Sequence, residues 1–520
     1  MQINNFLEDA AQKFPDNKAV WYKGSWTSYG QIDVLANKLA NYLKETGISR
    51  GDRVAILYEN SLDYIIAFFA VLKAGAVDVS LYTEMTVGTL THALSHSGAK
   101  ALIADSKYSH YIVPSLGRAP ELRDVIANRE GVFENEGNVR CNHICLKEIY
   151  DNGKATQPGV QCIDVDLASI VYTSGTTGGP KGVMLSHLNV VSNTRSIVRY
   201  LELTQKDRVM VVLPFCYKYG KSLLTTHFYA GGSVVIDNRF VFPQVVLETM
   251  RQTEVTGFAG VPSTFLMLLN RSIALDLRCE SLRYVTQAGG SMAPSIQKKV
   301  AAVFAPAKLF VMYGATEASP RLSYLDPADF SSKCGSVGKA ISNVELFVVD
   351  EHGHRLPPNG VGEIVARGSN IMMGYWNDPV ETSRVLRNGL YHTGDIGKMD
   401  EDGYIYLLGR SDDMIKVSGL KVSPREIEDA LLDVEGVYEA AVIGVNDSVL
   451  GQAIAAFVVP EENTRLTKDR IRKALRSRLP AFKRPTQIEF VSSIPKNASG
   501  KIAGAELRMR YEPSRKSAHS

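Results

Sequence analysis

The densest group of potential phosphate ligands lies in residues 172–182, which read Tyr-Thr-Ser-Gly-Thr-Thr-Gly-Gly-Pro-Lys-Gly. Glycines let a backbone turn sharply and bring its N–H groups close to an anion. The Ser and Thr hydroxyls donate further hydrogen bonds, and Lys181 adds a positive charge. The segment therefore predicts a cradle for the phosphates of a nucleoside triphosphate. The alternative is a surface loop rich in Ser, Thr and Gly.

This segment differs from the common P-loop, in which a first glycine and four further residues precede Gly-Lys-Ser/Thr. Pro180 separates Gly179 from Lys181. The only Gly-Lys-Ser of the chain, residues 220–222, has Phe215 where the first glycine should be. The spacing therefore argues against a P-loop.

A second candidate group is Met-Tyr-Gly-Ala-Thr-Glu at residues 312–317, which follows a run typical of a strand. The ring of Tyr313, beside a glycine turn, could stack on a purine. Thr316 could donate to a phosphate, and Glu317 could hold Mg²⁺ through oxygen. A strand-to-loop junction with an exposed acid is the alternative for this segment alone.

Further polar residues lie at turns in the last third of the chain. Asp395 is a candidate acceptor for ribose hydroxyls and Arg410 a candidate donor, although either alone is typical of a polar turn. We do not expect Asp412 and Asp413 to form an acid/base pair, because neighbours on an extended chain point to opposite faces. Lys501 follows a flexible glycine and could reach a distant site, although most lysines are solvated surface groups.

Composition limits the class of protein. A chain of 520 residues predicts two to four domains, and 45% hydrophobic residues with a net charge of +3 give no argument for nucleic acid or membrane binding. The start lacks the basic and apolar regions of a secretory signal. Six cysteines fit a reducing cytoplasm. Cys141, His143 and Cys145 lack an obvious fourth ligand, so we expect a loop or strand there rather than a metal site.

Strand-like and helix-like runs alternate through residues 1–400, which predicts an α/β fold with largely parallel sheets. We expect a buried helix at 64–73, because this apolar run is too short to cross a bilayer. The predicted strands include 53–57, 209–213, 233–236 and 308–312. Closely spaced strands and turns at 343–410 predict a smaller β-rich subdomain. Residues 413–520 form a compact αβ unit with a helix starting at Pro424.

Taken in order, these motifs resemble those of the AMP-forming adenylating enzymes, which include acyl-CoA synthetases, peptide synthetase adenylation domains and firefly luciferase. The resemblance covers nearly the whole chain and is specific for the superfamily, much less so for the substrate. It implies a large N-terminal domain, residues 1–411, and a small mobile C-terminal domain, residues 412–520, with a hinge at Asp412. The remaining matching segments are 27–30, 52–55, 72–76, 287–291, 362–364, 391–395, 409–416, 418–421 and 499–501.

The resemblance also implies roles for individual residues. Residues 173–181 hold the β- and γ-phosphates, Glu317 ligates Mg²⁺ together with Thr176, and Lys501 bridges the carboxylate and the α-phosphate. After the small domain rotates, the element around Gly419 and Lys421 replaces Lys501. The residues of the nucleotide site are then Thr173, Ser174, Gly175, Thr176, Thr177, Gly178 and Lys181 at the phosphates; Gly289, Gly290, Ser291, Tyr313 and Gly314 at adenine; Thr316 at the α-phosphate; and Asp395 and Arg410 at ribose.

The implied reaction uses ATP and Mg²⁺ to convert a carboxylic acid into an acyl-adenylate, with release of pyrophosphate. A thiol then attacks the adenylate and AMP leaves. The leading expectation for the acceptor is CoA, and the alternative is the phosphopantetheine of a separate acyl carrier protein. A third possibility, a non-catalytic nucleotide-binding protein, requires the loss of catalytic groups, whereas Lys181, Glu317 and Lys501 are all present.

In such enzymes the acyl pocket borders residues 213–220, and this chain has Tyr217 where many relatives carry His. Residues 258–265, with Phe258 and Gly260, are expected to line the opposite wall. No acid occurs between Pro214 and Ala230, which disfavours an α-amino acid and favours an apolar or aromatic one. A second substrate carboxylate could instead meet a basic side chain, although we expect solvated lysines here. The basic candidates are Lys218, Lys221 and His227.

Residues 465–484 carry nine Lys and Arg and a single acid, Asp469. Ile471, Leu475 and Leu479 recur every four residues, so this helix is expected to bury one face and expose a basic one. CoA phosphates or an acidic carrier protein would suit that face, and an inert solvated surface is the alternative.

Overall fold

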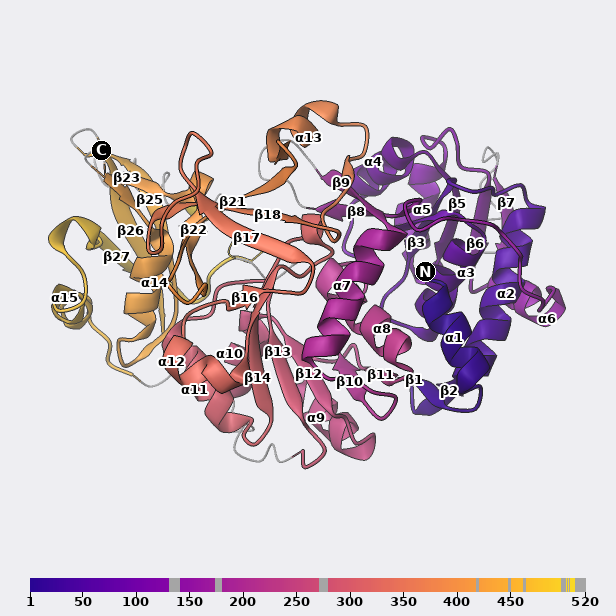
Figure 1. The fold of residues 1–520 in the computed structure, drawn as a ribbon, viewed down its shortest axis with the longest axis horizontal. Coiled ribbons are helices and arrows are strands. Elements are labelled where there is room, and N and C mark those ends of the chain that lie inside the picture. Colours follow the sequence, from indigo (N-terminus) through magenta and orange to yellow (C-terminus); the bar gives the residue numbers. More distant parts are fainter. Residues whose placement is uncertain are drawn as a thin grey trace.

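The computed structural model describes residues 1–130, 141–173, 180–270, 279–417, 420–447, 450–461, 464–496, 502, 504 and 506–509. Two large sheets, a smaller β-rich subdomain and a C-terminal sheet follow one another along the chain (Figure 1). The predicted α/β class with parallel-rich sheets is confirmed.

The first large sheet has nine strands in the order β16-β15-β14-β13-β12-β10-β11-β1-β2. Its central strands are parallel, and β2, β15 and β16 run antiparallel to their neighbours. The carboxyl ends of parallel strands therefore meet at one edge, which is where ligands bind in open α/β sheets. The strands are β1 (Lys18–Tyr22), β2 (Ser25–Ser28), β10 (Arg208–Val211), β11 (Ser233–Ile236), β12 (Gly257–Gly260), β13 (Tyr284–Gln287), β14 (Lys308–Tyr313), β15 (Ser323–Leu325) and β16 (Lys339–Ala340).

The second large sheet has eight strands in the order β19-β9-β8-β4-β3-β5-β6-β7. Strands β3 to β8 pair in parallel, whereas β9 and β19 are antiparallel. Its strands are β3 (Arg53–Leu57), β4 (Val77–Ser80), β5 (Ala99–Ala104), β6 (Asp124–Ala127), β7 (Asn142–Cys145), β8 (Leu167–Thr173), β9 (Lys181–Ser186) and β19 (Gly374–Tyr375). The segment of Cys141 and Cys145 thus lies at strand β7.

Helices fill the space between the two large sheets. One buried cluster joins Val54 and Ile56 of the eight-stranded sheet to Val209 and Val211 of the nine-stranded sheet, through side chains of α3 and α8. The predicted buried helix is α3, whose N-terminus is capped by Ser61. These helices include α1 (Asn5–Lys13), α2 (Tyr29–Glu45), α3 (Leu62–Lys73), α7 (His187–Tyr200) and α8 (Lys218–Ala230).

Separate clusters cover the outer faces of the two sheets. On the eight-stranded sheet they involve α4 (Val87–Ser97) and α5 (Ser109–Leu116), with α6 (Leu146–Asn152) packed on α2. On the nine-stranded sheet they involve α9 (Pro243–Gln252), α10 (Pro262–Asn270) and α11 (Pro294–Val303), with α12 (Phe330–Lys333) nearby. The two sheets and three helical layers place the carboxyl ends of β8, β13 and β14 toward the β-rich subdomain (Figure 1).

The β-rich subdomain is an antiparallel sheet in the order β17-β18-β21-β20, with β22 paired to β21. Its strands are β17 (Val344–Val349), β18 (Val361–Gly368), β20 (Leu386–Arg387), β21 (Leu390–Met399) and β22 (Ile405–Arg410), and α13 (Pro379–Val385) packs beside it. Its strands lie between Val344 and Arg410.

The C-terminal unit begins after the 3₁₀ turn at Ser411–Asp413. Its sheet runs β24-β23-β26-β25, with β27 paired to β26. Its elements are β23 (Ile415–Val417), β24 (Leu420–Val422), α14 (Pro424–Leu432), β25 (Val437–Asp447), β26 (Gly451–Pro460), α15 (Lys468–Arg476) and β27 (Gln487–Phe490). Ile471, Leu475 and Leu479 are buried as the spacing predicts, although α15 itself ends at Arg476.

A search of the described residues finds no helix whose length and apolar character would let it cross a bilayer. It also finds no group of three or more His, Cys, Asp or Glu side chains arranged to hold a metal ion.

Candidate functional site

The predicted phosphate loop connects two antiparallel strands. Thr173 at the end of β8 pairs with Lys181 at the start of β9, and the Thr173 Oγ1 donates to the Lys181 carbonyl at 3.5 Å. Helix α7 follows β9 directly, with a capping box at Ser186. The predicted order of strand, loop, strand and helix is thus confirmed. The loop residues Ser174, Gly175, Thr176, Thr177 and Gly178 lie outside the described residues.

Lys181 lies against α13 of the β-rich subdomain. Its Nζ is 2.5 Å from Oε1 of Glu381 and 5.4 Å from the centre of the Tyr375 ring. The hydrogen bond from Lys181 lowers the pKa of the Glu381 carboxyl, against burial, which raises it. The sequence analysis did not identify Glu381. Its only local signal is its place in the first turn of α13, where its backbone N–H is capped by Asp378.

Glu317 lies in the 3₁₀ turn η3 (Thr316–Ala318), directly after β14. Its Oε1 accepts a hydrogen bond from the Tyr375 hydroxyl at 2.9 Å. Burial, and then the charge of Glu317, raise the pKa of Tyr375. Gly314 permits this turn, because a Cβ at that position would lie 1.7 Å from the Pro320 carbonyl oxygen. Tyr375 therefore contacts both residues, Lys181 through its ring and Glu317 through its hydroxyl.

The predicted adenine and ribose residues also meet. The Tyr313 hydroxyl, at the end of β14, donates to Oδ2 of Asp395 at 2.6 Å. Asp395 of β21 pairs in register with Arg410 of β22, and their charged groups are 3.4 Å apart. Burial alone would lower the pKa of Arg410, but Asp395 and then Tyr391, Tyr313 and Glu317 raise it. Glu317 is thus close enough to Arg410 to affect its pKa. We call Lys181, Glu317, Tyr313, Asp395 and Arg410 the polar edge.

Glu363, from the Gly-Glu-Ile motif at residues 362–364, holds Asp395 in place. Oε1 of Glu363 accepts the backbone N–H of Gly394 at 3.0 Å, and its Oε2 lies 2.8 Å from Nδ1 of His392. Gly394 has φ +71°, a conformation that favours glycine. Glu363 therefore fixes the turn that presents Asp395 to the edge.

Gly289, Gly290 and Ser291 follow β13 and are exposed. Gln287, the last residue of β13, donates from Nε2 to the Gly290 carbonyl at 2.9 Å. Gly289 has φ +83°, and a Cβ there would lie 2.9 Å from Val261. The three residues thus form an open backbone wall at the carboxyl end of the sheet, beside the strand that carries Tyr313.

The residues predicted to act through domain movement lie apart from this edge in sequence. Asp412 is exposed in the 3₁₀ turn between β22 and β23, and Lys421 is exposed on β24. Asp412 and Asp413 do not lie on an extended chain, because Ser411–Asp413 form a helical turn. The premise about their opposite faces is therefore wrong. Gly419 and Lys501 lie outside the described part of the chain.

The residues expected to line the acyl pocket lie in two different surroundings. Tyr217, just before α8, is half-buried and stacks on Tyr82 with ring centres 6.4 Å apart. Phe258 instead belongs to the cluster between the nine-stranded sheet and α9 to α11, where it packs on Phe265 and Phe304. A Cβ on Gly260 would also meet Phe265, 2.9 Å away. Strand alternation sends Phe258 and Gly260 to the face opposite α8.

The two lysines of α8 are buried rather than solvated. Lys221 Nζ lies 2.5 Å from Oδ2 of Asp78 and 2.8 Å from Oγ of Ser80. Ser169 of β8 donates to the same Asp78 oxygen at 2.9 Å. This network therefore ties α8 to β4 and to the strand that leads into the phosphate loop.

A small cavity lies between α7, α8, β13 and β14. Its volume of about 10 Å³ is the room that one water needs. The side chains around it are Ile197, Tyr200, Leu201, Tyr219, Ser222, Leu223, Thr226, His227, Tyr284, Thr286, Met312 and Arg321. Arg321, four residues after Glu317, was not identified from the sequence.

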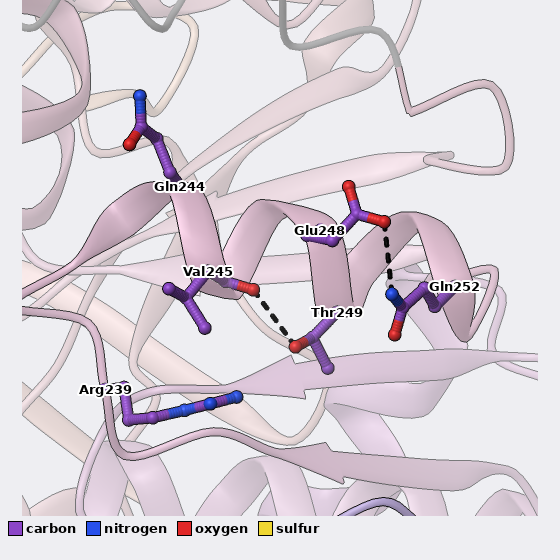
Figure 2. A pocket seen from close by; sticks show the side chains of 6 residues that line it. All are labelled: Arg239, Gln244, Val245, Glu248, Thr249 and Gln252. Atoms are coloured by element: carbon purple, nitrogen blue, oxygen red, sulfur yellow. Dashed lines mark hydrogen bonds between the residues drawn. The ribbon is translucent and has the colours of Figure 1, made fainter.

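A second, open hollow lies along α9 (Figure 2). Its polar side chains bond to one another or to their own helix: Gln252 donates to Glu248, and Thr249 to the Val245 carbonyl. Arg239 pairs with Asp237 at 2.7 Å. Helix α9 lies at the other end of the molecule from α13 and the Lys181 edge (Figure 1). The hollow therefore adds no side chain to the candidate site.

The model of the AMP-binding enzyme family matches residues 7–376, and that of its C-terminal domain matches residues 426–501. The chain belongs to the AMP-binding enzyme family. The first match includes the two large sheets, and the second includes the C-terminal unit from within α14 to β27.

This AMP-binding enzyme is similar to acyl-CoA ligases over nearly its whole length. It is 34% identical to a feruloyl-CoA synthase of Amycolatopsis sp over 505 residues, which are 96% of this chain and 97% of the relative. It is 31% identical to a long-chain-fatty-acid–CoA ligase of Salmonella typhimurium, over 96% of this chain and 93% of that protein.

Solved structures agree with these relatives. The anthranilate CoA ligase AuaEII in complex with anthranoyl-AMP has a TM-score of 0.91 and 26% identity, covering 99% of this chain and 98% of its own. ATP-bound MatB from Rhodopseudomonas palustris has a TM-score of 0.88 and 28% identity, covering 98% and 99%. This AMP-binding enzyme is therefore an AMP-forming ligase of the acyl-CoA synthetase type.

Proposed function

We propose that this enzyme activates a carboxylic acid with ATP as an acyl-adenylate and then transfers the acyl group to the thiol of CoA. The observation that carries the proposal is the polar edge at which Lys181, Glu317, Tyr313, Asp395 and Arg410 meet, from five separate elements. This edge offers a cation for phosphates, a carboxylate for Mg²⁺, and an acceptor and a donor for ribose hydroxyls. Such a set suits a nucleoside triphosphate.

In the first step a carboxylate oxygen of the acid attacks the α-phosphorus of ATP, the bond from that phosphorus to the β-phosphate oxygen breaks, and pyrophosphate leaves. Negative charge shifts onto the phosphate oxygens, so positive groups and N–H or O–H donors lower the barrier. We assign this work to Lys181 and the loop 174–178 at the leaving phosphates, and to Thr316 and Lys501 at the α-phosphate.

Glu317 is the residue that we assign to Mg²⁺, together with Thr176. Its carboxylate is half-buried and accepts a hydrogen bond from the Tyr375 hydroxyl, which leaves further oxygen lone pairs for a hard cation. When bound, Mg²⁺ neutralises charge on the phosphates of ATP. The Tyr375 hydroxyl orients the carboxylate for that contact.

In the second step the thiol sulfur attacks the acyl carbon, the acyl–phosphate bond breaks, and AMP leaves. We propose that the C-terminal domain, residues 412–520, turns about Asp412 between the steps, so that Gly419 and Lys421 replace Lys501. The exposed position of Asp412 between β22 and β23 supports a hinge there. One cavity can then serve two reactions that need different groups.

The relatives act on aromatic and on long apolar acids, by the names feruloyl-CoA synthase, anthranilate CoA ligase and long-chain-fatty-acid–CoA ligase. We therefore propose an acid with an aromatic or apolar body. CoA is the proposed acceptor, and the exposed Arg472, Lys473 and Arg476 of α15 supply positive charge for its phosphates. The described cysteines are all unpaired, which fits the cytoplasm expected from the sequence.

The test measures pyrophosphate release with ATP and Mg²⁺ across a panel of carboxylic acids, with and without CoA, and follows acyl-CoA by mass spectrometry. Release that depends on an acid, together with acyl-CoA formation, supports the proposal. Acyl-adenylate without thioester, but with transfer to a phosphopantetheinylated carrier protein, favours the carrier instead. Absence of turnover with every acid contradicts the proposal.

A further inference from the structure

Arg321 is a buried cation whose position is fixed by its backbone. It is 2% exposed and lies between the turn of Glu317 and β15, two residues before that strand. Its carbonyl accepts hydrogen bonds from Nδ2 of Asn193 at 2.9 Å and of Asn370 at 2.8 Å, and its N–H donates to Oδ1 of Asn193. These two asparagines come from distant parts of the chain, so the guanidinium is held at one place in the core.

No carboxylate of the described residues forms an ion pair with Arg321, and its Nε has no hydrogen-bond partner there. The guanidinium carbon lies 5.3 Å from the centre of the Tyr219 ring. Tyr200 is its polar neighbour: burial raises the pKa of that phenol, whereas the charge of Arg321 and a hydrogen bond with its side chain lower it. A fully buried charge without an opposite charge is costly, so proteins rarely keep one unless it has a partner.

Of the other basic groups of α8, only His227 lines the cavity, whereas Lys218 and Lys221 lie outside its lining. Lys221 is paired with Asp78. His227 lies between the Leu223 carbonyl, 2.9 Å from Nδ1, and the Tyr284 hydroxyl, 3.0 Å from Nε2, and burial lowers its pKa to about 4. His227 is therefore uncharged at neutral pH, and Arg321 gives the cavity its positive charge.

The cavity at Arg321 is next to the polar edge along strands β13 and β14. Thr286 of β13 lines the cavity, and Gly289 follows it at the edge. Met312 of β14 lines the cavity, and Tyr313 follows it at the edge. Tyr219 lines it from α8, two residues after Tyr217. An acid that reaches the α-phosphate with its reacting carboxylate therefore extends toward Arg321 with its far end.

The hydroxyls around this cavity already have partners within the protein. Tyr219 donates to Thr286, Ser222 to the Tyr219 carbonyl, and Thr226 to the Ser222 carbonyl. The donor without a partner among the described residues is Nε of Arg321. A planar guanidinium matches a carboxylate through two parallel hydrogen bonds, whereas a neutral acyl chain would leave the charge without a partner.

We propose that the acid activated by this enzyme carries a second carboxylate at the end remote from the reacting one, and that Arg321 pairs with it. This inference rests on the proposed acid–thiol ligase activity. It adds to that activity a substrate class, the dicarboxylic acids with an aromatic or apolar body, and a residue that selects them. The cavity holds about one water as it stands, so the terminal oxygens of the substrate take the place of that water.

The test compares straight-chain dicarboxylic acids and a para-dicarboxylic benzene with their monomethyl esters, which keep the length and lose the second charge. Adenylation is followed as pyrophosphate release, for the wild type and for Arg321→Gln, Arg321→Lys and a control, Arg208→Gln. Arg208 lies at the amino end of β10, opposite the carboxyl edge of the sheet, and pairs with the exposed Glu254. Melting temperatures show which variants fold.

We expect the wild type to prefer a diacid over its ester by at least about 30-fold in kcat/KM, since removing one partner of a buried charge pair is strongly unfavourable. Arg321→Gln should lose that preference and treat diacid and ester alike, Arg321→Lys should regain part of it, and Arg208→Gln should keep it.

A wild type that turns over monoacids and esters as well as diacids overturns the inference but leaves the ligase activity intact. A preference for diacids that Arg321→Gln retains also overturns it. If Arg321→Gln does not fold, Arg321→Lys takes its place. A reduced preference for diacids in Arg321→Lys supports the inference, and an unchanged preference contradicts it. Failure of the wild type with every acid contradicts the proposed function itself.

Discussion

The polar edge and the Arg321 cavity differ in how their charged side chains are paired and exposed. At the edge, Lys181 meets Glu381 and Arg410 meets Asp395, and all four side chains remain partly accessible. A few residues away, Arg321 is 2% exposed and has no carboxylate partner among the described residues. Both regions are built on the carboxyl ends of β13 and β14.

The difference indicates two ways of preparing a site for an anion. At the edge, screened ion pairs contribute little stability, so phosphates can replace Glu381 or Asp395 at small cost. In the cavity, the cation is already desolvated, so an anion that arrives there gains a full charge-assisted pair. We infer that the edge serves a ligand shared by many enzymes and the cavity serves the choice of acid.

The largest effect is expected at Lys501. Lys501→Ala should lower acid-dependent pyrophosphate release by about 1000-fold, because it removes a positive group from the developing charge at the α-phosphate. Attack of CoA on a synthetic acyl-adenylate should change far less, since Gly419 and Lys421 serve that step. The measurement compares the two half-reactions. An equal loss in both would show that Lys501 is not specific to adenylation.

A second prediction concerns the paired charge of α8. Asp78→Asn leaves Lys221 buried without its counter-ion and should cost about 3–5 kcal/mol in the free energy of unfolding. The control, Glu254→Gln, breaks an ion pair whose carboxylate is 74% exposed and should change stability by less than about 1 kcal/mol. Urea titrations of both variants provide the comparison. Similar losses for both would contradict the role of burial.

Lys218 of the same helix, which forms no ion pair among the described residues, should behave in the opposite way. Lys218 is 5% exposed, and burial, followed by the charge of Lys221, lowers its pKa from 10.5 to about 7. Since the unfolded chain binds the proton more tightly, the cost of Lys218 is complete below pH 7 and disappears as the pH rises to 10.5. Lys218→Met should therefore stabilise the protein by about 3 kcal/mol at pH 6 and less at pH 9.

Urea titrations of the wild type and Lys218→Met at the two pH values check this prediction. A gain that does not depend on pH would mean that packing of the methionine, and not removal of a charge, is responsible. A loss of stability would contradict the account of Lys218 altogether.

The smallest effect is expected at the ribose contacts. Asp395→Asn should raise the KM for ATP by about 10-fold, because it weakens hydrogen bonds from a charged acceptor. Tyr313→Phe, which removes only the donor to Asp395, should raise it less. Initial rates at varied ATP concentration distinguish the two. A larger effect of Tyr313→Phe would assign the main contact to the tyrosine instead.

Much of the fold follows from local patterns in the sequence. The apolar runs gave β3, α3, β11 and β14 close to their observed ends, and the order of strand, loop, strand and helix at 167–187 is correct. The β-rich range 343–410 was recognisable because turn residues recur there at short intervals. These features depend on neighbours in the chain, which a sequence displays directly.

The candidate site was predictable only where a motif marks it. Lys221 was expected to be solvated, but its partner Asp78 lies 143 residues away, and no local pattern announces that contact. Phe258 packs on Phe265 and Phe304, and the sequence does not show this, because alternation along β12 defines two faces without saying which one meets α8. Arg321 has no motif of its own, and its burial depends on Asn193 and Asn370.

The most direct test of the central claim is the exchange of labelled pyrophosphate into ATP, catalysed by the wild type with one acid at a time and without CoA. Exchange reports reversible formation of the acyl-adenylate alone. The account predicts exchange only when an acid is present, strongest for acids with a second carboxylate. Exchange that needs no acid, or none with any acid, would contradict it.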